Sequence, residues 1–399
     1  MSLSINPRSR QIKPPGIRQF SNQLIHYPDA VNLTVGQPDF PTPEAVKQAG
    51  IAAIQANQTG YSHNAGLPAL REAASRFISQ KFNATYDPIK EIIVTNGATE
   101  AIDSIFRTIL EPGDEVIIPA PIYSGYEPLI ELSGARVVYL DTSHTGLQPD
   151  AYSIEQAITP STKAILFNNP SNPTGVTMDK QRIDEIVEVL KNKDLFILSD
   201  EIYSENVFDG QHVSFASYPE IRRQLFLIHG VSKSHSMTGW RIGFIFGDAE
   251  WIATITLLHA YNTICASVPA QHATIEALTG SIDAPLEMNK AYRVRRDFVY
   301  DRLLKLGMEV EKPQGAFYIF PSIRTYGLSS FDFATRLLQE GGVAVVPGSV
   351  FTPFGEGFIR ISFAYSMEQL ILGMDRLEAF TLNLQRETSP VISASNSKM

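Results

Sequence analysis

The sequence predicts an α/β fold with a mainly parallel sheet and a second, smaller unit, and three observations lead to this prediction. From about residue 91 onward, short runs of β-branched and apolar residues alternate with helical stretches. Strands that alternate with helices are typical of a parallel sheet covered on both faces. The chain has 399 residues, which is longer than a single core usually grows. Hydrophobic residues make up 44% and charged residues 19%, as in an ordinary soluble globular protein.

The elements can be placed in chain order. An extended N-terminal arm is expected first, because Pro7, Pro14, Pro15 and Gly16 interrupt any helix there. Strands are then expected over residues 91–95, 115–119, 136–140, 164–168, 195–199, 225–229 and 242–247, which makes a seven-stranded sheet. Helices are expected over residues 99–110, 124–132, 179–191 and 251–263. A long charged helix over residues 285–306 then leads to strand-like segments at residues 315–320 and 357–363.

These elements divide the chain into four expected regions. Residues 1–45 form the N-terminal arm and part of a small domain, and residues 46–284 form a large domain. Residues 285–384 form the C-terminal small domain, a second α/β unit. Residues 385–399 are polar and small, so they are expected to form a disordered tail.

Composition excludes several classes of protein. The net charge is −9 and no Lys/Arg-rich block occurs, so nucleic acid is not an expected partner. Cys265 is the only cysteine, which rules out an intrachain disulfide and favours a reducing compartment. Residues 1–18 lack the pattern of a signal peptide. Residues 251–275 carry no formal charge, but polar residues and a proline interrupt them, so no membrane span is predicted. A cytoplasmic protein is expected.

Polar motifs follow four of the predicted strands directly. They occupy residues 96–99, 169–175, 200–203 and 232–233. In an open α/β sheet, ligands bind in the crevice outside the carboxyl ends of the strands. The four motifs are therefore expected to meet at one site.

The most informative motif is the run around Lys233. This lysine lies between two serines, the first of them Ser232, and Arg241 follows eight residues later. A carbonyl cofactor that bears a phosphate needs an amine for a Schiff base, and hydroxyl and guanidinium groups for the phosphate. Alone, the tripeptide Ser-Lys-Ser is more often a solvated loop, so the hypothesis depends on the other motifs.

The second motif, Gly97-Ala98-Thr99, is suited to bind the phosphate. Small residues between a strand and a helix let backbone amides approach an anion, and the hydroxyl of Thr99 adds a donor. A simple helix cap explains the same residues equally well. No lysine is placed to make a Walker loop, so a nucleoside triphosphate is not suggested.

The remaining motifs suit an aromatic nitrogen ring. Asp200 ends a strongly apolar strand, and a buried carboxylate must be paired. A protonated pyridine nitrogen is a suitable partner, which makes the ring an electron sink. Tyr203 and Asn172 could reach the phenolic oxygen of that ring, and Tyr123 could stack on it. Singly, these residues are also explained by a helix cap, a turn and core packing. Together with Lys233 they predict a pyridoxal 5′-phosphate site.

A metal site is not predicted. The zinc motif His-Glu-x-x-His and a cysteine pair are both absent from the sequence. His229 and His235 flank Lys233, but two histidines without a third ligand make a weak metal site.

These motifs resemble those of the fold-type I, class I aminotransferases that use pyridoxal phosphate, in the branch with aspartate, aromatic and kynurenine aminotransferases. The resemblance extends from about Val31 to Leu384, nearly the whole chain. The matching motifs occur in the family's order, at residues 36–41, 61–72, 97–99, 169–175, 200–203, 232–241 and 360.

The resemblance implies further roles. Lys233 is the implied Schiff-base lysine, and Arg360 is similar to the arginine that binds the substrate α-carboxylate, with Gly36 and Asn172 beside it. Tyr61 is similar to a tyrosine that reaches across a homodimer to the partner's cofactor phosphate. The implied reaction moves an amino group from an L-amino acid to a 2-oxo acid such as 2-oxoglutarate.

The substrate side chain is less constrained by the sequence. Residues 14–21 and 35–40 resemble bacterial aminotransferases assigned to N-acetyl-LL-diaminopimelate in lysine biosynthesis. Arg18 could meet a distal carboxylate, although a solvated arginine is an equal explanation. Other residues that could line the side-chain pocket are Ile17, Tyr61, Tyr126 and Tyr318. An aspartate- or aromatic-type aminotransferase of broad specificity and a cysteine-conjugate β-lyase remain alternatives.

Overall fold

The central feature of the fold is a seven-stranded sheet. The computed structural model describes residues 5–12, 16, 20 and 22–388. The sheet has the order β2-β8-β7-β6-β5-β3-β4. Its strands are β2 (Ile92–Thr95), β3 (Glu115–Ala120), β4 (Arg136–Asp141), β5 (Thr162–Asn168), β6 (Phe196–Asp200), β7 (Leu225–Gly230) and β8 (Gly243–Phe246). Strand β8 is antiparallel to its neighbours β2 and β7, and the other neighbouring strands are parallel. The mainly parallel sheet predicted from the sequence is confirmed.

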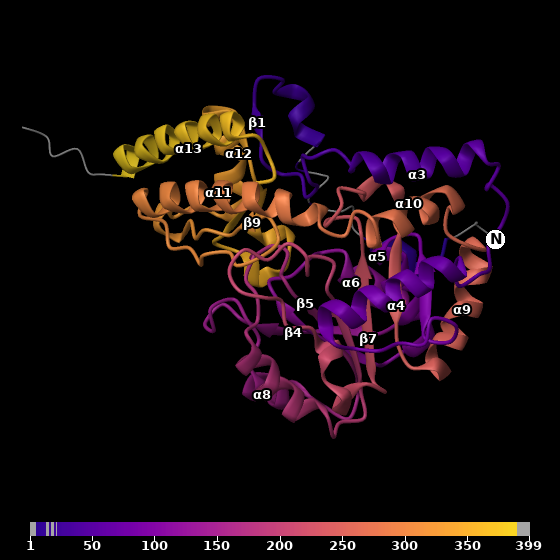
Figure 1. The fold of residues 1–399 in the computed structure, drawn as a ribbon. Helices are drawn as coiled ribbons and strands as arrows, with labels where there is room; N and C mark the ends of the chain where they lie inside the picture. Colours follow the sequence, from indigo (N-terminus) through magenta and orange to yellow (C-terminus); the bar gives the residue numbers. More distant parts are fainter. Residues whose placement is uncertain (1–4, 13–15, 17–19, 21, 389–399) are drawn as a thin grey trace, which may run out of the picture.

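Helices cover both faces of this sheet (Figure 1). One face packs against α4 (Pro68–Phe82), α8 (Lys180–Leu190) and α10 (Val268–Leu278). The other packs against α5 (Ala98–Ile109), α6 (Tyr126–Leu132) and α9 (Ala249–Thr263). Helix α3 (Glu44–Gln55) lies along α10, and α7 (Ala151–Ala157) lies beside α8. Successive residues of a strand point to opposite faces, which is why the strands other than the edge strand β4 are buried along nearly their whole length.

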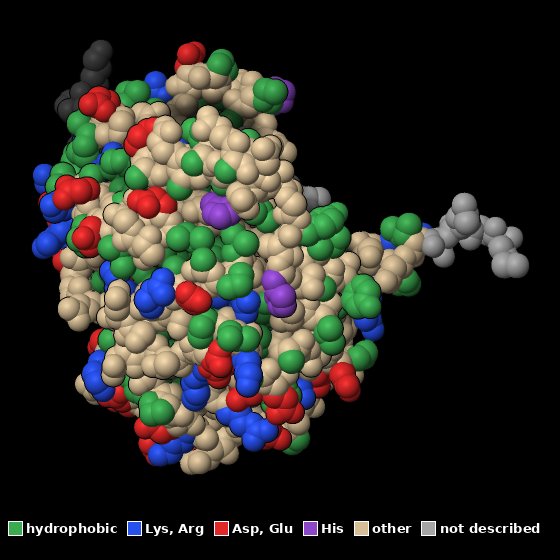
Figure 2. All heavy atoms as spheres, turned by 45° about the vertical axis from the view of Figure 1, so that its right-hand side comes forward, with side chains coloured by type: hydrophobic (Ala, Val, Ile, Leu, Met, Phe, Trp, Pro, Cys, Tyr) green, Lys and Arg blue, Asp and Glu red, His purple; other side chains and the backbone are tan. Residues whose placement is uncertain are grey.

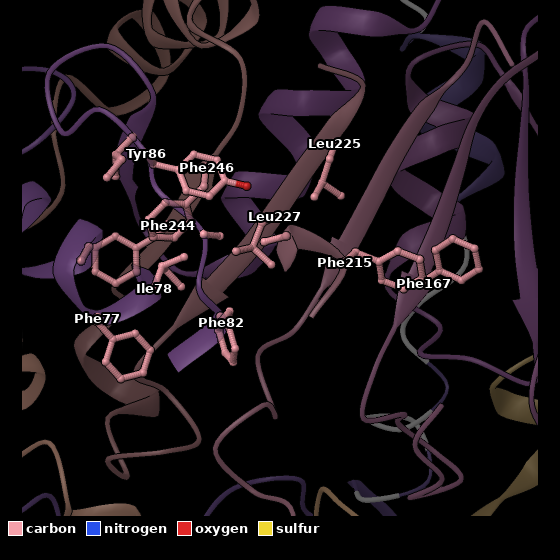
Figure 3. Close-up of a cluster of buried hydrophobic side chains, with 14 of the residues drawn as sticks. Phe77, Ile78, Phe82, Tyr86, Phe167, Phe215, Leu225, Leu227, Phe244 and Phe246 are labelled. Carbon is pink, nitrogen blue, oxygen red and sulfur yellow. The ribbon is translucent and has the colours of Figure 1, made fainter. Parts of the chain in front are cut away.

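Figure 3 shows the core on the α4 face of the sheet. Ile92 and Val94 of β2 enter this core, whereas Ile93 between them enters the core on the α5 face. Aromatic rings fill the space between the sheet and the helices, and Phe167 stacks on Phe215 with ring centroids 4.9 Å apart. The two cores hold the strands rigidly, so the strand ends provide fixed positions for polar side chains.

A second unit lies beside the sheet and carries its own core (Figure 1). It contains α11 (Ala284–Lys305), α12 (Ser330–Gly341), α13 (Met367–Thr388), β1 (Val31–Asn32), β9 (Tyr318–Ile319), β10 (Val343–Ala344), β11 (Val346–Pro347) and β12 (Ile359–Ser362). Strands β11, β12 and β9 form an antiparallel sheet, and β1 pairs with β10 in parallel. Because β1 belongs to the N-terminal part of the chain, this unit joins both ends of the sequence.

Short 3₁₀ helices lie in the connections: η1 (Asn22–His26), η2 (Phe215–Ser217), η3 (Pro219–Ile221), η4 (Thr238–Trp240), η5 (Arg324–Tyr326), η6 (Gly348–Val350) and η7 (Pro353–Gly355). Among the residues that the structure describes, no helix has the length and apolar composition needed to cross a membrane. The uncharged segment 251–275 instead divides into α9 and the first part of α10.

Two expectations about the chain ends were wrong in part. The N-terminal arm contains the helix α1 (Pro7–Gln11), because Pro7 stands in the first turn, where proline is tolerated, and Asn6 Oδ1 accepts the N–H of Arg8 at 3.0 Å. Helix α13 continues past Leu384 to Thr388, into the expected tail. Residues 389–399, and also 13–15, lie outside the described residues. The domain boundaries stay a prediction.

Candidate active site

A cavity of about 1200 Å³ opens at the carboxyl ends of the parallel strands and is bordered by the second unit. The residues that the sequence predicted for the site and that line this cavity are Gly36, Ala98, Thr99, Tyr123, Asn172, Asp200, Tyr203, Ser232, Lys233, Arg241 and Arg360. They come from segments after β1, β2, β3, β5, β6 and β7 and from β12. The polar motifs that follow the strands therefore meet at one cavity. The role of each residue stays a prediction.

Lys233 follows β7 and projects toward the segment after β1. Its Nζ donates a hydrogen bond to the carbonyl oxygen of Gly36 at 2.8 Å. Burial lowers the pKa of this lysine to about 8, and the positive charges of Arg360 and Arg241 act in the same direction. An amine with this pKa has an appreciable neutral fraction near neutral pH, so it can attack a carbonyl group.

Asp200 ends β6 and is only 5% exposed. Tyr126 donates its hydroxyl to Asp200 Oδ2 at 2.7 Å, and the N–H of Ile202 donates to Oδ1 at 3.2 Å. Burial raises the pKa of this carboxyl to about 6, although both hydrogen bonds oppose the shift. A carboxylate so desolvated is stabilised by a cationic partner, and a protonated pyridine nitrogen would supply one.

Arg360 lies in β12 and is 1% exposed. Its Nη1 donates to Asn172 Oδ1 at 2.9 Å, and its Nη2 donates to the carbonyl oxygen of Thr34 at 2.5 Å. The guanidinium stacks over the ring of Tyr318, 4.4 Å from the centroid. Among the described residues its Nε has no hydrogen-bond partner. A buried guanidinium that lines a cavity is suited to bind a carboxylate.

Gly36 is placed close to two tyrosines. Any side chain at Gly36 would collide with the hydroxyl of Tyr318. That hydroxyl lies 2.8 Å from the hydroxyl of Tyr203. Glycine thus lets the chain after β1 approach Lys233 and Tyr318 together, which closes this side of the cavity.

The turn between β2 and α5 forms the anion-binding end of the cavity. Gly97 has φ +85° and a Cβ there would collide with the guanidinium of Arg241. Arg241 is held by the carbonyl oxygens of Thr238 at 2.9 Å and Asn96 at 3.2 Å. Ala98 and Thr99, which begin α5, line the cavity together with Arg241, and the first N–H groups of a helix have no partner within the helix. Cation, hydroxyl and backbone donors together fit a phosphate dianion.

Among the described residues, two of the predicted ones, Tyr61 and Gly97, do not line this cavity, although Gly97 lies against the guanidinium of Arg241. Tyr61 is 82% exposed, in the loop between α3 and α4. Ile17 and Arg18 lie outside the described residues. Tyr126 and Tyr318, which were predicted only as candidates for the pocket, both line the cavity.

Other residues at the site were not singled out from the sequence. Thr34 and Phe351 contact Arg360, and Asn168 Oδ1 accepts the N–H of Asn172 at 2.8 Å. Asn168 ends β5, so the strand-end rule could have found it, whereas Thr34 and Phe351 are distant in sequence. The two histidines near Lys233 bind serine hydroxyls: His229 Nε2 lies 2.7 Å from Ser204, and His235 Nδ1 lies 2.8 Å from Ser234.

Comparisons with known proteins find relatives over nearly the whole chain. The family model described as "Aminotransferase class I and II" matches residues 28–377. A "Probable N-acetyl-LL-diaminopimelate aminotransferase" from Bacillus subtilis is 50% identical over 393 residues, covering 98% of this chain and 99% of the relative. The crystal structure of an aspartate aminotransferase from Thermus thermophilus with maleate superposes with a TM-score of 0.91 at 34% identity, over 95% of this chain and 100% of the other. An aromatic aminotransferase from Pyrococcus horikoshii superposes with a TM-score of 0.88 at 36% identity, over 92% and 99%.

Proposed function

The chain belongs to the class I and II aminotransferases, which use pyridoxal 5′-phosphate, and we propose that its amino donor is N-acetyl-LL-2,6-diaminopimelate and its acceptor 2-oxoglutarate. The observation that carries the proposal for the site is that Lys233 and Arg360 line one cavity, the first as an amine and the second as a buried guanidinium suited to a carboxylate. The proposal for the donor rests on the similarity to the Bacillus subtilis relative.

The cavity residues fit the cofactor, and each has a proposed role. When bound, pyridoxal phosphate supplies a carbonyl that joins the amino group and a ring that withdraws electrons from Cα. Asp200 would hold the proton on the ring nitrogen of the bound cofactor, and the amine of Lys233 would serve as the base and acid for the proton on the substrate Cα. Arg360 binds the substrate carboxylate, with Asn172 and the backbone of Gly36 beside it.

Other residues hold the cofactor in the proposed site. Tyr123 would stack on the ring, and Tyr203 and Asn172 would donate to its phenolic oxygen. The first turn of α5, the guanidinium of Arg241 and the hydroxyls of Thr99 and Ser232 would hold the phosphate. The residues proposed for the phosphate are Gly97, Ala98, Thr99, Ser232 and Arg241.

We also propose a cytoplasmic homodimer in which Tyr61 reaches the phosphate of the partner's site. Tyr61 is 82% exposed, and α9 beside its loop exposes Leu257 and Tyr261 at 65% and 93%. Asn64 Nδ2 ties the loop to α9 by donating to the carbonyl oxygen of Ile264 at 2.8 Å. Figure 2, which turns this side of the molecule forward, shows hydrophobic side chains scattered through the middle of the face and charged side chains along its left side and in its lower part. An exposed apolar face of this kind is suited to a subunit interface.

The test follows the absorbance of the purified protein as amino donors are added. A yellow band that bleaches with N-acetyl-LL-2,6-diaminopimelate and returns with 2-oxoglutarate is expected. Lys233→Ala should show no such band and no turnover, since it removes the amine. If aspartate or an aromatic amino acid bleaches the band and N-acetyl-LL-2,6-diaminopimelate does not, that amino acid is the donor. Release of pyruvate and ammonia from a cysteine conjugate would indicate the β-lyase. The absence of a band after addition of pyridoxal phosphate would contradict the whole site.

A further inference from the structure

Glu100 lies directly behind the turn proposed to bind the phosphate, in the first turn of α5. Its Oε2 accepts the backbone N–H of Asn96 at 3.1 Å, and its Oε1 accepts the hydroxyl of Ser104 at 2.6 Å. A glutamate in the first turn that reaches back to a preceding N–H stabilises the start of a helix. Here the same contact also fixes the backbone that leads into Gly97.

The main chain of Asn96 is held from two sides. Glu100 accepts its N–H, and Arg241 donates Nη2 to its carbonyl oxygen at 3.2 Å. The next residue, Gly97, leaves no room for a Cβ beside the guanidinium of Arg241. A rotation of the Asn96 backbone would therefore displace the guanidinium, so the position of the cation depends on the contact that Glu100 makes.

Helix α9 supplies a buried partner for Glu100. His259 is 0% exposed, and its Nδ1 lies 3.1 Å from Glu100 Oε1. Among the described residues the other ring nitrogen, Nε2, has no hydrogen-bond partner. The hydrogen of the imidazole is therefore best placed on Nδ1, where it is donated to the carboxylate. The pair connects α9 to the turn between β2 and α5.

We propose that Glu100, held by His259, is a positioning residue for the cofactor phosphate. It fixes the backbone of Asn96 and thereby the guanidinium of Arg241, and it does not touch the phosphate itself. A carboxylate near a dianion repels it, so the contribution of Glu100 has to come from geometry rather than from charge. The inference rests on the phosphate site proposed above and adds a residue outside it.

The experiment measures how tightly the protein without cofactor binds pyridoxal phosphate and pyridoxal, which lacks the phosphate. Glu100→Ala is expected to weaken binding of pyridoxal phosphate about tenfold, the scale on which outer-shell partners affect a site. Binding of pyridoxal should not change. Glu100→Gln keeps an acceptor for the N–H of Asn96, so it should stay within about twofold of the wild type. Inorganic phosphate, added as a competitor of pyridoxal phosphate, should compete less well in Glu100→Ala.

A matched control comes from the same helix. Asp103 also forms a carboxylate contact on α5, with Arg107 Nε at 3.0 Å, but it lies away from the turn. Asp103→Ala removes one negative charge from α5 and should leave both affinities unchanged. If Glu100→Ala does not fold, as judged by circular dichroism, His259→Gln removes the imidazole and should show a smaller loss that is again selective for pyridoxal phosphate.

Two results would overturn the inference. Equal losses for pyridoxal phosphate and pyridoxal would indicate general damage to the fold, and tighter binding in both Glu100 variants would mean that charge repulsion dominates. Arg241→Ala separates this failure from a failure of the proposed site. This substitution should weaken the binding of pyridoxal phosphate but not that of pyridoxal. If it weakens the binding of neither, the phosphate does not bind at this turn.

Discussion

At the scale of single residues, burial of charged side chains shifts their pKa values and determines which ligand the site favours. Lys233, Arg241 and Arg360 line one cavity together with Asp200. Burial lowers the pKa of the lysine to about 8 and raises the pKa of the aspartate to about 6. Both shifts favour the neutral forms, and both would be offset by a cofactor with a cationic ring and an anionic phosphate. The cavity is thus preorganised for a ligand of that charge pattern.

The first prediction concerns the pH at which the cofactor attaches to Lys233. Because burial lowers the pKa of this amine to about 8, its neutral form should increase up to that pH. The attachment rate should rise about tenfold per pH unit below pH 8 and level off above it, instead of rising toward the usual lysine value near 10.4. Absorbance after rapid mixing of pyridoxal phosphate with cofactor-free protein measures this rate.

The control for this pH profile is Arg360→Met, which removes a positive charge that lowers the pKa of the lysine. The midpoint should then move to higher pH. A rate that continues to rise to pH 10 in the wild-type protein would show that the amine is not perturbed in this way.

The second prediction concerns the geometry of Arg360. Arg360→Lys keeps the charge but loses the planar fork that contacts Asn172 and Thr34. The kcat/KM for the amino donor should fall by roughly 10²- to 10³-fold, the effect of losing about 3–4 kcal/mol of charge-assisted binding. The affinity for pyridoxal phosphate should not change. Steady-state kinetics measure the first quantity, and a titration with pyridoxal phosphate measures the second. A weaker affinity for pyridoxal phosphate with unchanged kcat/KM would mean that Arg360 binds the cofactor and not the substrate carboxylate.

At the scale of elements, local patterns predicted the sheet well because each strand is apolar on both faces. The strands β2 to β8 and the polar motifs after them were found from residues that are close in sequence. The contact between Tyr126 and Asp200 joins residues 74 apart, and no local pattern indicates it. The same holds for Thr34 and Arg360, which are 326 residues apart. Proline content predicted an extended arm, but a capped first turn places Pro7 in α1.

The third prediction concerns the loop after β5, which packs against the second unit. Gly175 has φ +73°, and a Cβ there would collide with the carbonyl oxygen of Tyr318 in β9. Gly175→Ala should therefore lower the free energy of unfolding by about 2–4 kcal/mol, from backbone strain and the collision together. Urea unfolding measures the difference.

Gly146 provides the matched control for this substitution. Its φ is +69°, and nothing lies within 4 Å of an added Cβ. Gly146→Ala carries the backbone strain alone, and it should cost about 1 kcal/mol. Equal effects of the two substitutions would show that the contact between the loop and β9 does not hold the two units together.

At the scale of the whole molecule, the site is assembled from distant parts of the chain. The sheet supplies Lys233 and Asp200, and the second unit supplies Arg360 and the segment that carries Gly36. Both cores must therefore be formed and in contact before the cavity exists. The proposed contribution of Tyr61 from a partner subunit extends the same requirement to the dimer.

The fourth prediction tests that contribution by mixing two inactive variants. Lys233→Ala lacks the amine, and Tyr61→Ala lacks the residue proposed to serve the partner's site. In a mixed dimer, the intact Lys233 of one subunit faces the intact Tyr61 of the other, so one of the two sites is complete. Random exchange makes half of the dimers mixed, and about a quarter of the wild-type activity should appear. If Tyr61 instead served its own subunit, every site would lack one of the two residues and mixing would restore nothing. Activity measured before and after subunit exchange therefore distinguishes a site shared between subunits from a site contained in one.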